Sequence, residues 1–394
     1  MRAWSKVTIG ELGRVVTGAT PRTGDDAAWG DEVDFITPTE MSYSNREPTG
    51  CRRLSREGLE PLMRRFIPAG SVLFTCIGFS TGKVARISRP AVTNQQVNSL
   101  IPDPNVVDAL FAYYLLRKNS ADIRHIASGS TTPIVNKSTF QAFEVELPEL
   151  PEQQAIAAVL GALDDKIAVN ERIAATARQL GVTYFGAAIE SGSTPMAVDK
   201  LAAYLNRGQA PRYTDDEDGL VVLNQKCIRG GSVILEPARK TQAGRVHAER
   251  RLAFGDVLVN STGVGTLGRI GIWSHQIDAT VDSHVTIVRI NHDLVPPVIG
   301  GFAMLSVQPI IEAMGEGSTG QTELSRTKLG QVEVRLPDAD REGLASRLIS
   351  LETRSHAALR ESDSLATLRD TLLPQLMSGK LRVRDAERIV EDAV

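Results

Sequence analysis

The sequence predicts an α+β protein in which two similar β-rich modules are joined by two long antiparallel helices, as a pseudo-twofold internal repeat. Three observations support this fold class. An apolar pattern of helical spacing runs through residues 148–194, the same pattern returns in residues 338–394, and short motifs of residues 1–147 recur in order in residues 195–337. These four ranges, within 394 residues, are the predicted domains and helices.

The first helical pattern follows a Pro-rich break, and Pro151 suits the first turn of a helix, where the missing N–H removes no hydrogen bond. Its inward positions alternate in steps of four and three, as in helices that pack along one another: Ile156, Leu160, Leu163, Ile167, Asn170, Ala174, Ala177, Gly181, Tyr184 and Ala188. At about 1.5 Å per residue, the helix would be roughly 55–60 Å long.

The second pattern is displaced from the first by 188 residues. Its inward positions are Leu344, Leu348, Leu351, Ser355, Ala358, Ser362, Leu365, Arg369, Leu372 and Leu376. Both patterns have small or polar residues at their centres, so an antiparallel pair would let the two backbones approach closely. Arg369 weakens the pattern, and we expect Pro374 to bend the helix or to begin a short new one that ends at Gly379. The alternative is two unrelated amphipathic helices, each covering its own module.

The two modules are predicted to consist of short strands and turns. Residues 66–87 have the pattern of a β-hairpin, residues 91–102 that of one strand with a polar centre, and residues 108–128 that of one amphipathic helix. The second module repeats this order at displacements of 185 to 190 residues, which matches Lys83 with Arg269. Five such matches in order indicate a duplicated module.

Composition limits the classes of function. The net charge is −3, so a site for a polyanion must be a local face of the molecule. The three cysteines have no metal-ligand or disulfide spacing, and no run of 18 apolar residues or signal peptide is apparent. We expect a cytoplasmic protein that does not associate with membranes.

Motifs of catalysis are missing or weak. Gly263–Gly268 matches GxGxxG, but a strand pattern follows it, which favours a hairpin turn over a nucleotide site. Asp164, Asp165 and Lys166 are interpreted as a solvated helix face. No metal-ligand spacing, nucleophile elbow or Asn/Asp-Pro-Pro-aromatic motif of adenine methyltransferases occurs. We therefore expect no catalytic residues, no metal site and no cofactor in this chain.

Polar turn residues recur at matched places in the two modules, and their types are those that read base edges and hold phosphates. In addition, local positive charge comes from Arg22, Lys83, Arg212 and Arg269. The candidate DNA-binding residues are Arg22, Thr37, Thr39, Lys83, Asn94, Gln95, Gln96, Thr131, Arg212, Asn224, Gln225, Lys226, Arg269, Ser283, His284, Thr319 and Gln321. Ordinary turn and cap polarity is the alternative for each residue alone.

Two segments resemble a known family. LPELPEQQAIAAVLGALDDKIAVNERI, at residues 147–173, looks like the central conserved region of specificity subunits of type I restriction–modification systems, and LRDTLLPQLMSGKL, at 368–381, looks like their distal conserved region. The resemblance implies two target-recognition domains that each grip one half of a split DNA site. It also implies that the paired helices set the spacing of the half-sites and dock two methyltransferase subunits.

The resemblance further implies that catalysis resides elsewhere. S-adenosylmethionine, ATP and magnesium would act in partner methyltransferase and restriction/translocase subunits, and double-stranded DNA would be the ligand. Three alternatives remain: a nuclease or methyltransferase with a cryptic site, a scaffold that binds no DNA, and an orphan subunit that redirects a partner methyltransferase without a restriction enzyme. Methyl transfer or DNA cleavage by the chain alone would identify the first alternative. The absence of a footprint on DNA would identify the scaffold, and the flanking genes would identify the orphan subunit.

Overall fold

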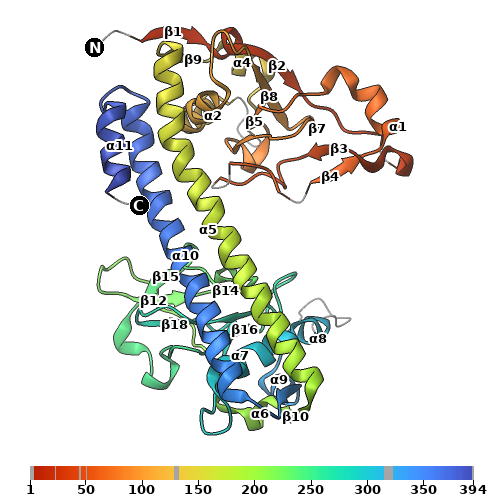
Figure 1. Ribbon diagram of the computed structural model, residues 1–394, viewed down its shortest axis with the longest axis vertical. Coiled ribbons are helices and arrows are strands. Elements are labelled where there is room, and N and C mark those ends of the chain that lie inside the picture. Colours follow the sequence, from red (N-terminus) through yellow and green to blue (C-terminus); the bar gives the residue numbers. More distant parts are fainter. Residues whose placement is uncertain are drawn as a thin grey trace. The chain divides into compact units, whose positions relative to one another are not determined.

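The computed structural model describes residues 4–22, 24–43, 46–49, 51–127, 133–314 and 323–392. The chain forms two compact units. Unit 1 comprises residues 1–169 and 361–394, and unit 2 comprises residues 170–360. The two long helices, α5 (Leu150–Ser191) and α10 (Arg341–Leu376), each contribute residues to both units (Figure 1).

Unit 1 contains three sheets. The first pairs two antiparallel strands, β1 (Ser5–Thr8) and β9 (Glu144–Leu147). The second is antiparallel and has the order β2 (Gly13–Thr17), β8 (Val97–Pro102), β5 (Val72–Thr75), β6 (Val84–Arg86). The third has the order β4 (Arg52–Leu54), β3 (Trp29–Ile36), β7 (Ala91–Thr93), and its β3–β7 pair is parallel.

The shorter helices of unit 1 are α1 (Arg56–Leu59), α2 (Ala109–Lys118), α3 (Ser120–His125), α4 (Lys137–Ala142) and α11 (Val383–Glu391). The larger core of unit 1 lies between the antiparallel sheet, α2 and the long helices. It contains Phe74, Phe111, Leu160 and Leu372. The β-rich part of unit 1 and the long helices therefore share one core.

Unit 2 has the same plan. The strands β10 (Ser193–Ala197) and β20 (Glu333–Pro337) pair antiparallel. A six-stranded sheet has the order β11 (Ala202–Arg207), β19 (Val285–Ile290), β16 (Val257–Asn260), β17 (Ile270–Ile272), β14 (Gly231–Val233), β13 (Ile228–Arg229). A third sheet has the order β15 (Arg239–Thr241), β12 (Leu220–Leu223), β18 (Ala279–Val281), with a parallel β12–β18 pair.

The helices of unit 2 are α6 (Val198–Leu201), α7 (Pro297–Ser306), α8 (Gln308–Ala313) and α9 (Arg326–Gly330), besides the long ones. Phe302 and Ile299 of α7 pack with Val257 of the sheet and Leu348 of α10 in one apolar core. Helix α7 thus takes the place in unit 2 that α2 takes in unit 1.

The predicted internal repeat is confirmed by topology. The order β2-β8-β5-β6 of unit 1 corresponds to β11-β19-β16-β17 of unit 2, and β4-β3-β7 corresponds to β15-β12-β18. Two equivalent glycines show how closely the backbones agree. A Cβ atom on Gly18 would lie 2.0 Å from the carbonyl oxygen of Thr93, and one on Gly208 would lie 2.1 Å from that of Val281. Both positions therefore exclude any side chain.

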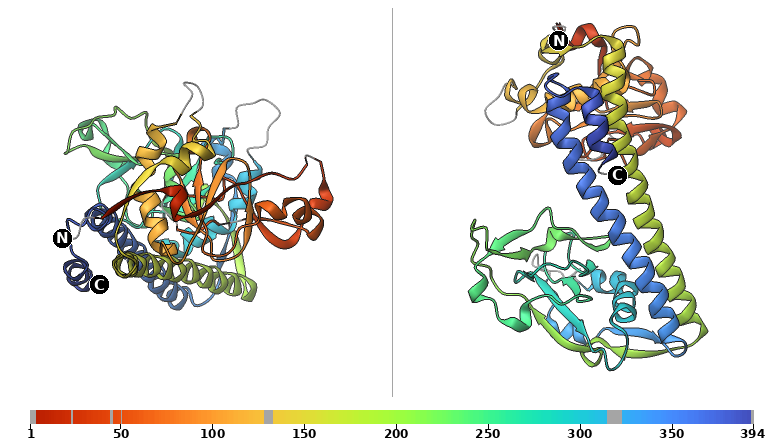
Figure 2. Two further views of the ribbon diagram at one scale, coloured as in Figure 1. Left: turned by 90° about the horizontal axis from the view of Figure 1, so that it is seen from above. Right: turned by 60° about the vertical axis from the view of Figure 1, so that its left-hand side comes forward.

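The two long helices lie side by side within each unit (Figure 2), so the predicted antiparallel pair is present. In unit 1 the hydroxyl of Ser362 donates to the carbonyl oxygen of Ile167, at 3.5 Å. In unit 2 the hydroxyl of Ser355 donates to the carbonyl oxygen of Ala174, at 3.3 Å. Small side chains thus allow the close approach of backbones that the sequence predicted.

Two local predictions were wrong. Residues 91–102 form two strands, β7 and β8, and Asn94, Gln95 and Gln96 are the turn between them. The equivalent residues 282–284 join β18 to β19. The helix predicted at 108–128 is broken at Asn119, whose side chain donates to the carbonyl oxygen of Leu115 and ends α2. Polar side chains that bond to nearby backbone produce both breaks.

The C-terminal end also differs from expectation. No new helix begins at Pro374, which lies inside α10, and that helix continues to Leu376. The next helix, α11, begins only at Val383 and was not predicted. Its Ala386 is fully buried in the core of unit 1, so α11 is an integral part of that unit.

Candidate nucleic-acid interface

Four loops of unit 1 come together at the ends of its strands. They follow β2, β3 and β7, and the fourth joins β5 to β6. Because β3 and β7 are parallel and end at paired residues, Ile36 and Thr93, the loops after them emerge side by side. The amide of Asn94 donates to the carbonyl oxygen of Ile36, at 3.0 Å, which joins these two loops directly.

The loop after β3 contains Thr37 and Thr39. Thr37 caps its own turn, because its backbone and hydroxyl both donate to the carboxylate of Glu40, at 2.7 Å. The amine of Lys83 reaches across from the β5–β6 hairpin and donates to the carbonyl oxygen of Pro38, at 2.8 Å. An ammonium group carries three donors, so Lys83 retains donors for a ligand while it anchors two loops.

The turn after β7 has a structural member and an outward-facing member. Asn94 is buried, and its Oδ1 accepts the amide of Gln96, at 3.1 Å, while its Nδ2 donates to Gln96 Oε1, at 3.0 Å. Gln95 is exposed and accepts a hydrogen bond from the hydroxyl of Thr20, at 2.6 Å. The residues that form the turn are thus distinct from the residue that it presents to solvent.

Unit 2 has equivalent loops. Oδ1 of Asp282 accepts the amide of His284, at 2.9 Å, as Asn94 does in unit 1. Burial raises the pKa of the Asp282 carboxyl. Asn224 follows β12 and caps the next turn by accepting the amide of Lys226, at 2.9 Å. Arg269 donates to the carbonyl oxygen of Gly265, at 2.8 Å, within the β16–β17 hairpin.

In unit 2 the side chains of Gln225 and His284 both contact Thr262. Nε2 of Gln225 donates to the hydroxyl of Thr262, at 2.6 Å, and to its carbonyl oxygen, at 2.9 Å. The same hydroxyl lies 2.8 Å from Nδ1 of His284. The structure thus brings together two predicted candidates from loops about 60 residues apart in the chain.

The remaining candidates are placed as follows. Arg22, Thr39, Arg212 and Lys226 are exposed, and Ser283 is partly exposed. Thr131, Thr319 and Gln321 lie outside the described residues. Thr20 and Thr262 were not among the predicted residues, although each bonds to one that was. The signal that could have found Thr20 is its position inside the repeated Gly18–Pro21 motif.

The inward positions of the long helices are mostly buried. Ile156, Leu160 and Leu163 of α5 lie in the core of unit 1 with Leu365, Leu372 and Leu376 of α10. Leu344 and Leu348 lie in the core of unit 2. Ile167 and Leu351 are partly buried, whereas Tyr184 is exposed. Asn170 is 2% exposed.

The interpretation of Asp164 as a solvated residue was wrong. Its side chain is buried and accepts hydrogen bonds from the guanidinium of Arg369, at 2.6 Å, and the hydroxyl of Tyr114, at 2.5 Å. Burial and then the Asp164 charge raise the pKa of Tyr114, which keeps its phenol protonated as a donor. Asp165 pairs with Arg46 and Lys166 with Glu361.

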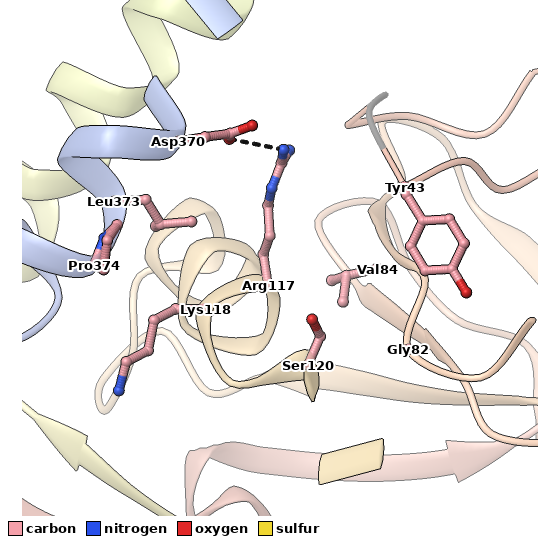
Figure 3. Close-up of a pocket in the computed structure, with 9 residues that line it drawn as sticks. All are labelled: Tyr43, Gly82, Val84, Arg117, Lys118, Ser120, Asp370, Leu373 and Pro374. Atoms are coloured by element: carbon pink, nitrogen blue, oxygen red, sulfur yellow. Dashed lines mark hydrogen bonds and ion pairs between the residues drawn. The ribbon is translucent and has the colours of Figure 1, made fainter. Parts of the chain in front are cut away.

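A pocket of about 330 Å³ lies in unit 1 beside α10 (Figure 3). Figure 3 shows Asp370 of the lining paired with Arg117, at 3.0 Å. The described residues include no group of three His, Cys, Asp or Glu side chains that could hold a metal ion. No helix in the described part of the chain has the length and apolarity needed to cross a bilayer.

Comparisons with known proteins agree with this architecture. Residues 1–179 match the model of the type I restriction modification DNA specificity domain. The MjaIX specificity subunit of Methanocaldococcus jannaschii is 32% identical over 42% of this chain and 38% of its own length. The HindI specificity subunit of Haemophilus influenzae is 33% identical over 37% of this chain and 32% of its own length. Each match thus spans about a third of the relative.

The fold similarity covers nearly the whole chain. The crystal structure of the S subunit of a type I restriction–modification system from M. genitalium matches 95% of this chain and 96% of its own, with a TM-score of 0.58 and 18% identity. At that identity the similarity concerns the fold. Residues 1–179 thus match a type I restriction modification DNA specificity domain, and the chain is similar in sequence to two specificity subunits and in fold to an S subunit.

Proposed function

We propose that this chain is the sequence-specific DNA-binding subunit of a type I restriction–modification complex and is not itself an enzyme. Each unit would read one half of a bipartite DNA site. The observation that carries this proposal is the duplication of one loop set on one sheet order, with polar and cationic side chains at equivalent places, such as Lys83 and Arg269. Two copies of one reading surface in one chain suit a site of two halves.

In this proposal the helix pair sets the spacing of the half-sites and docks two methyltransferase subunits. Supporting it, α5 is a single helix of 42 residues that takes part in both units, and α10 pairs with it in each. S-adenosylmethionine, ATP and magnesium would act in the methyltransferase and restriction subunits. The near-neutral charge of this chain is compatible with partners that contribute to the grip on phosphates.

The test is to map methylated adenines in cells that carry this gene and its neighbours. We expect one asymmetric motif with two specific halves and a gap of constant length. Deleting this gene alone should abolish methylation at that motif. Methylation that persists without this chain, or a motif that is continuous, would contradict the proposal.

The spacing role has its own test. Inserting seven residues after Asn170 in α5 and seven before Ala358 in α10 keeps the heptad-like pattern and lengthens the pair by about 10 Å, or about three base pairs. We expect the same two halves with a longer gap. As a control, seven residues inserted beside Asp293, in the exposed connection between β19 and α7, should leave the gap unchanged.

A further inference from the structure

The two equivalent hairpins, β5–β6 and β16–β17, each present one apolar side chain to solvent at their turns. Phe79 and Val264 are both 91% exposed. Each follows a glycine with positive φ, Gly78 at 78° and Gly263 at 104°. Glycine accommodates this backbone conformation without strain, and it turns the next residue away from the strands.

Both turns are held by hydrogen bonds. In unit 1 the hydroxyl of Thr81 donates to the carbonyl oxygen of Gly78, at 2.7 Å, and the amide of Gly78 donates to that of Pro133, at 3.0 Å. In unit 2 Nδ2 of Asn260 donates to the carbonyl oxygen of Thr266, at 3.1 Å. The apolar side chains are therefore presented by ordered backbone.

Exposure at these positions forgoes stability, because burying a Phe or Val side chain stabilises the folded state. One exposed apolar residue is common on protein surfaces. Two at equivalent positions of duplicated modules, each on a turn closed by its own hydrogen bonds, indicate a shared role.

The surroundings of both side chains are the candidate DNA-binding loops. In unit 2, Val264 follows Thr262, whose hydroxyl contacts His284 and Gln225. In unit 1, Phe79 lies on the hairpin whose Cys76 amide donates to the carbonyl oxygen of Gln96, at 2.8 Å. The same hairpin carries Lys83. Each apolar side chain thus projects beside the polar residues that are proposed to read bases.

We propose that Phe79 and Val264 are specificity-determining residues that make apolar contacts with bases, one in each half-site. This inference rests on the proposed function. Apolar side chains contact thymine methyl groups in the major groove or wedge between base steps, and neither contact requires a charge. Such contacts add discrimination without adding general affinity for phosphates.

The test compares Phe79→Ala and Val264→Ala in the complete complex with its modification subunits, on DNA carrying the mapped motif and on random duplex. We expect Phe79→Ala to weaken binding to the motif roughly tenfold to a hundredfold, and Val264→Ala by a smaller factor. Binding to random duplex and the slope of affinity against salt should not change, because no charge is lost. Each variant should relax methylation specificity in one half-site only.

Phe254→Ala is the matched control, because Phe254 is also exposed, at 71%, but precedes β16 at the strand's other end from the hairpin. It should bind the motif as the parent does. Unchanged binding by Phe79→Ala and Val264→Ala, while Gln95→Ala weakens binding, would overturn the inference and leave the proposed function standing. Equal losses on motif and random DNA would also overturn the inference. Failure of the unaltered complex to bind any DNA would contradict the proposed function itself.

Discussion

Units 1 and 2 have chemically different side chains at equivalent contacts between their helices. A displacement of 188 residues relates Tyr114 of unit 1 to Phe302 of unit 2, Asp164 to Glu352, and Gly181 to Arg369. In unit 1, a buried ion pair joins Asp164 to Arg369, and Tyr114 donates to the same carboxylate.

Unit 2 has apolar packing at the equivalent place. Phe302 lies against Gly181, where an added Cβ would be 2.7 Å from the ring. Glu352 lies 3.2 Å from Nε2 of His356 on its own helix and forms a longer ion pair, at 4.0 Å, with Arg178 of α5. Duplication has thus preserved the crossing of the three helices but not the side chains that fill it. The candidate DNA-binding loops show the same behaviour, since the turns at Asn94 and Asp282 match while the side chains that they present differ.

The largest effect that distinguishes the units should come from Arg369→Met. It leaves the Asp164 carboxylate buried without its cation, which costs about 3–5 kcal/mol. Chemical denaturation, monitored by hydrogen exchange of the amides of α2, would measure the loss of stability in unit 1. Asp370→Asn, which alters the solvent-exposed partner of Arg369, should cost less than about 1 kcal/mol. A loss no larger for Arg369→Met than for Asp370→Asn would show that the ion pair does not hold this crossing.

On helix α5, an added methyl group should destabilise unit 2 at Gly181 but not at Gly186. Gly181→Ala places a Cβ against Phe302 and should cost about 1–3 kcal/mol, whereas Gly186→Ala on the same helix meets nothing within 4 Å. The latter should instead stabilise by about 0.5–1 kcal/mol, because alanine favours the helix. Thermal unfolding of both variants provides the comparison. Equal effects of the two substitutions would mean that Phe302 is not packed against Gly181.

The smallest effect concerns the equivalent turns at Asn94 and Asp282. Burial raises the pKa of Asp282, so the native state holds its proton to higher pH than the unfolded chain. Its contribution to stability therefore falls as pH rises through the unfolded and then the native pKa. The Tm of Asp282→Asn relative to the parent should rise as the pH increases above about 4, where the carboxyl of the unfolded chain loses its proton.

The reverse substitution, Asn94→Asp, should introduce the same pH-dependent loss into unit 1. Measuring Asp282→Asn in a His284→Gln background removes the neighbouring imidazole, which also acts on the pKa of this carboxyl. A Tm difference that shrinks as pH rises would contradict the assignment.

Much of this fold could be predicted from sequence, because its strongest signals are local or periodic. The spacing of Ile156, Leu160 and Leu163 required only the geometry of one helix. The repeated Gly18 and Gly208 indicated the duplication in the sequence. The structure gives the reason why both are glycine, since a carbonyl oxygen occupies the place of a side chain at each position. The hairpin interpretation of Gly263–Gly268 followed from the strand patterns on both sides, and β16 and β17 confirm it.

Other features depended on partners distant in the chain. Asp164 was misassigned because Arg369, its partner, lies 205 residues away, and because the charged residues Asp165 and Lys166 follow it directly. The turn at Asn94 had a local signal, since asparagine often bonds to backbone two residues on, but the apolar residues around it concealed two strands of three and six residues. The candidate interface was predicted by residue type, whereas the exposure of Phe79 depended on the backbone of its turn.

The central claim is that each unit reads its own half of one DNA site. The direct measurement is mapping of methylated adenines in cells that carry Gln95→Ala, altered in unit 1, or His284→Ala, altered in unit 2, together with the neighbouring genes. Both side chains are exposed members of equivalent turns. The account predicts that each variant relaxes one half of the motif, a different half for each, with the gap unchanged. Relaxation of the same half by both variants, or of both halves by either, would contradict it.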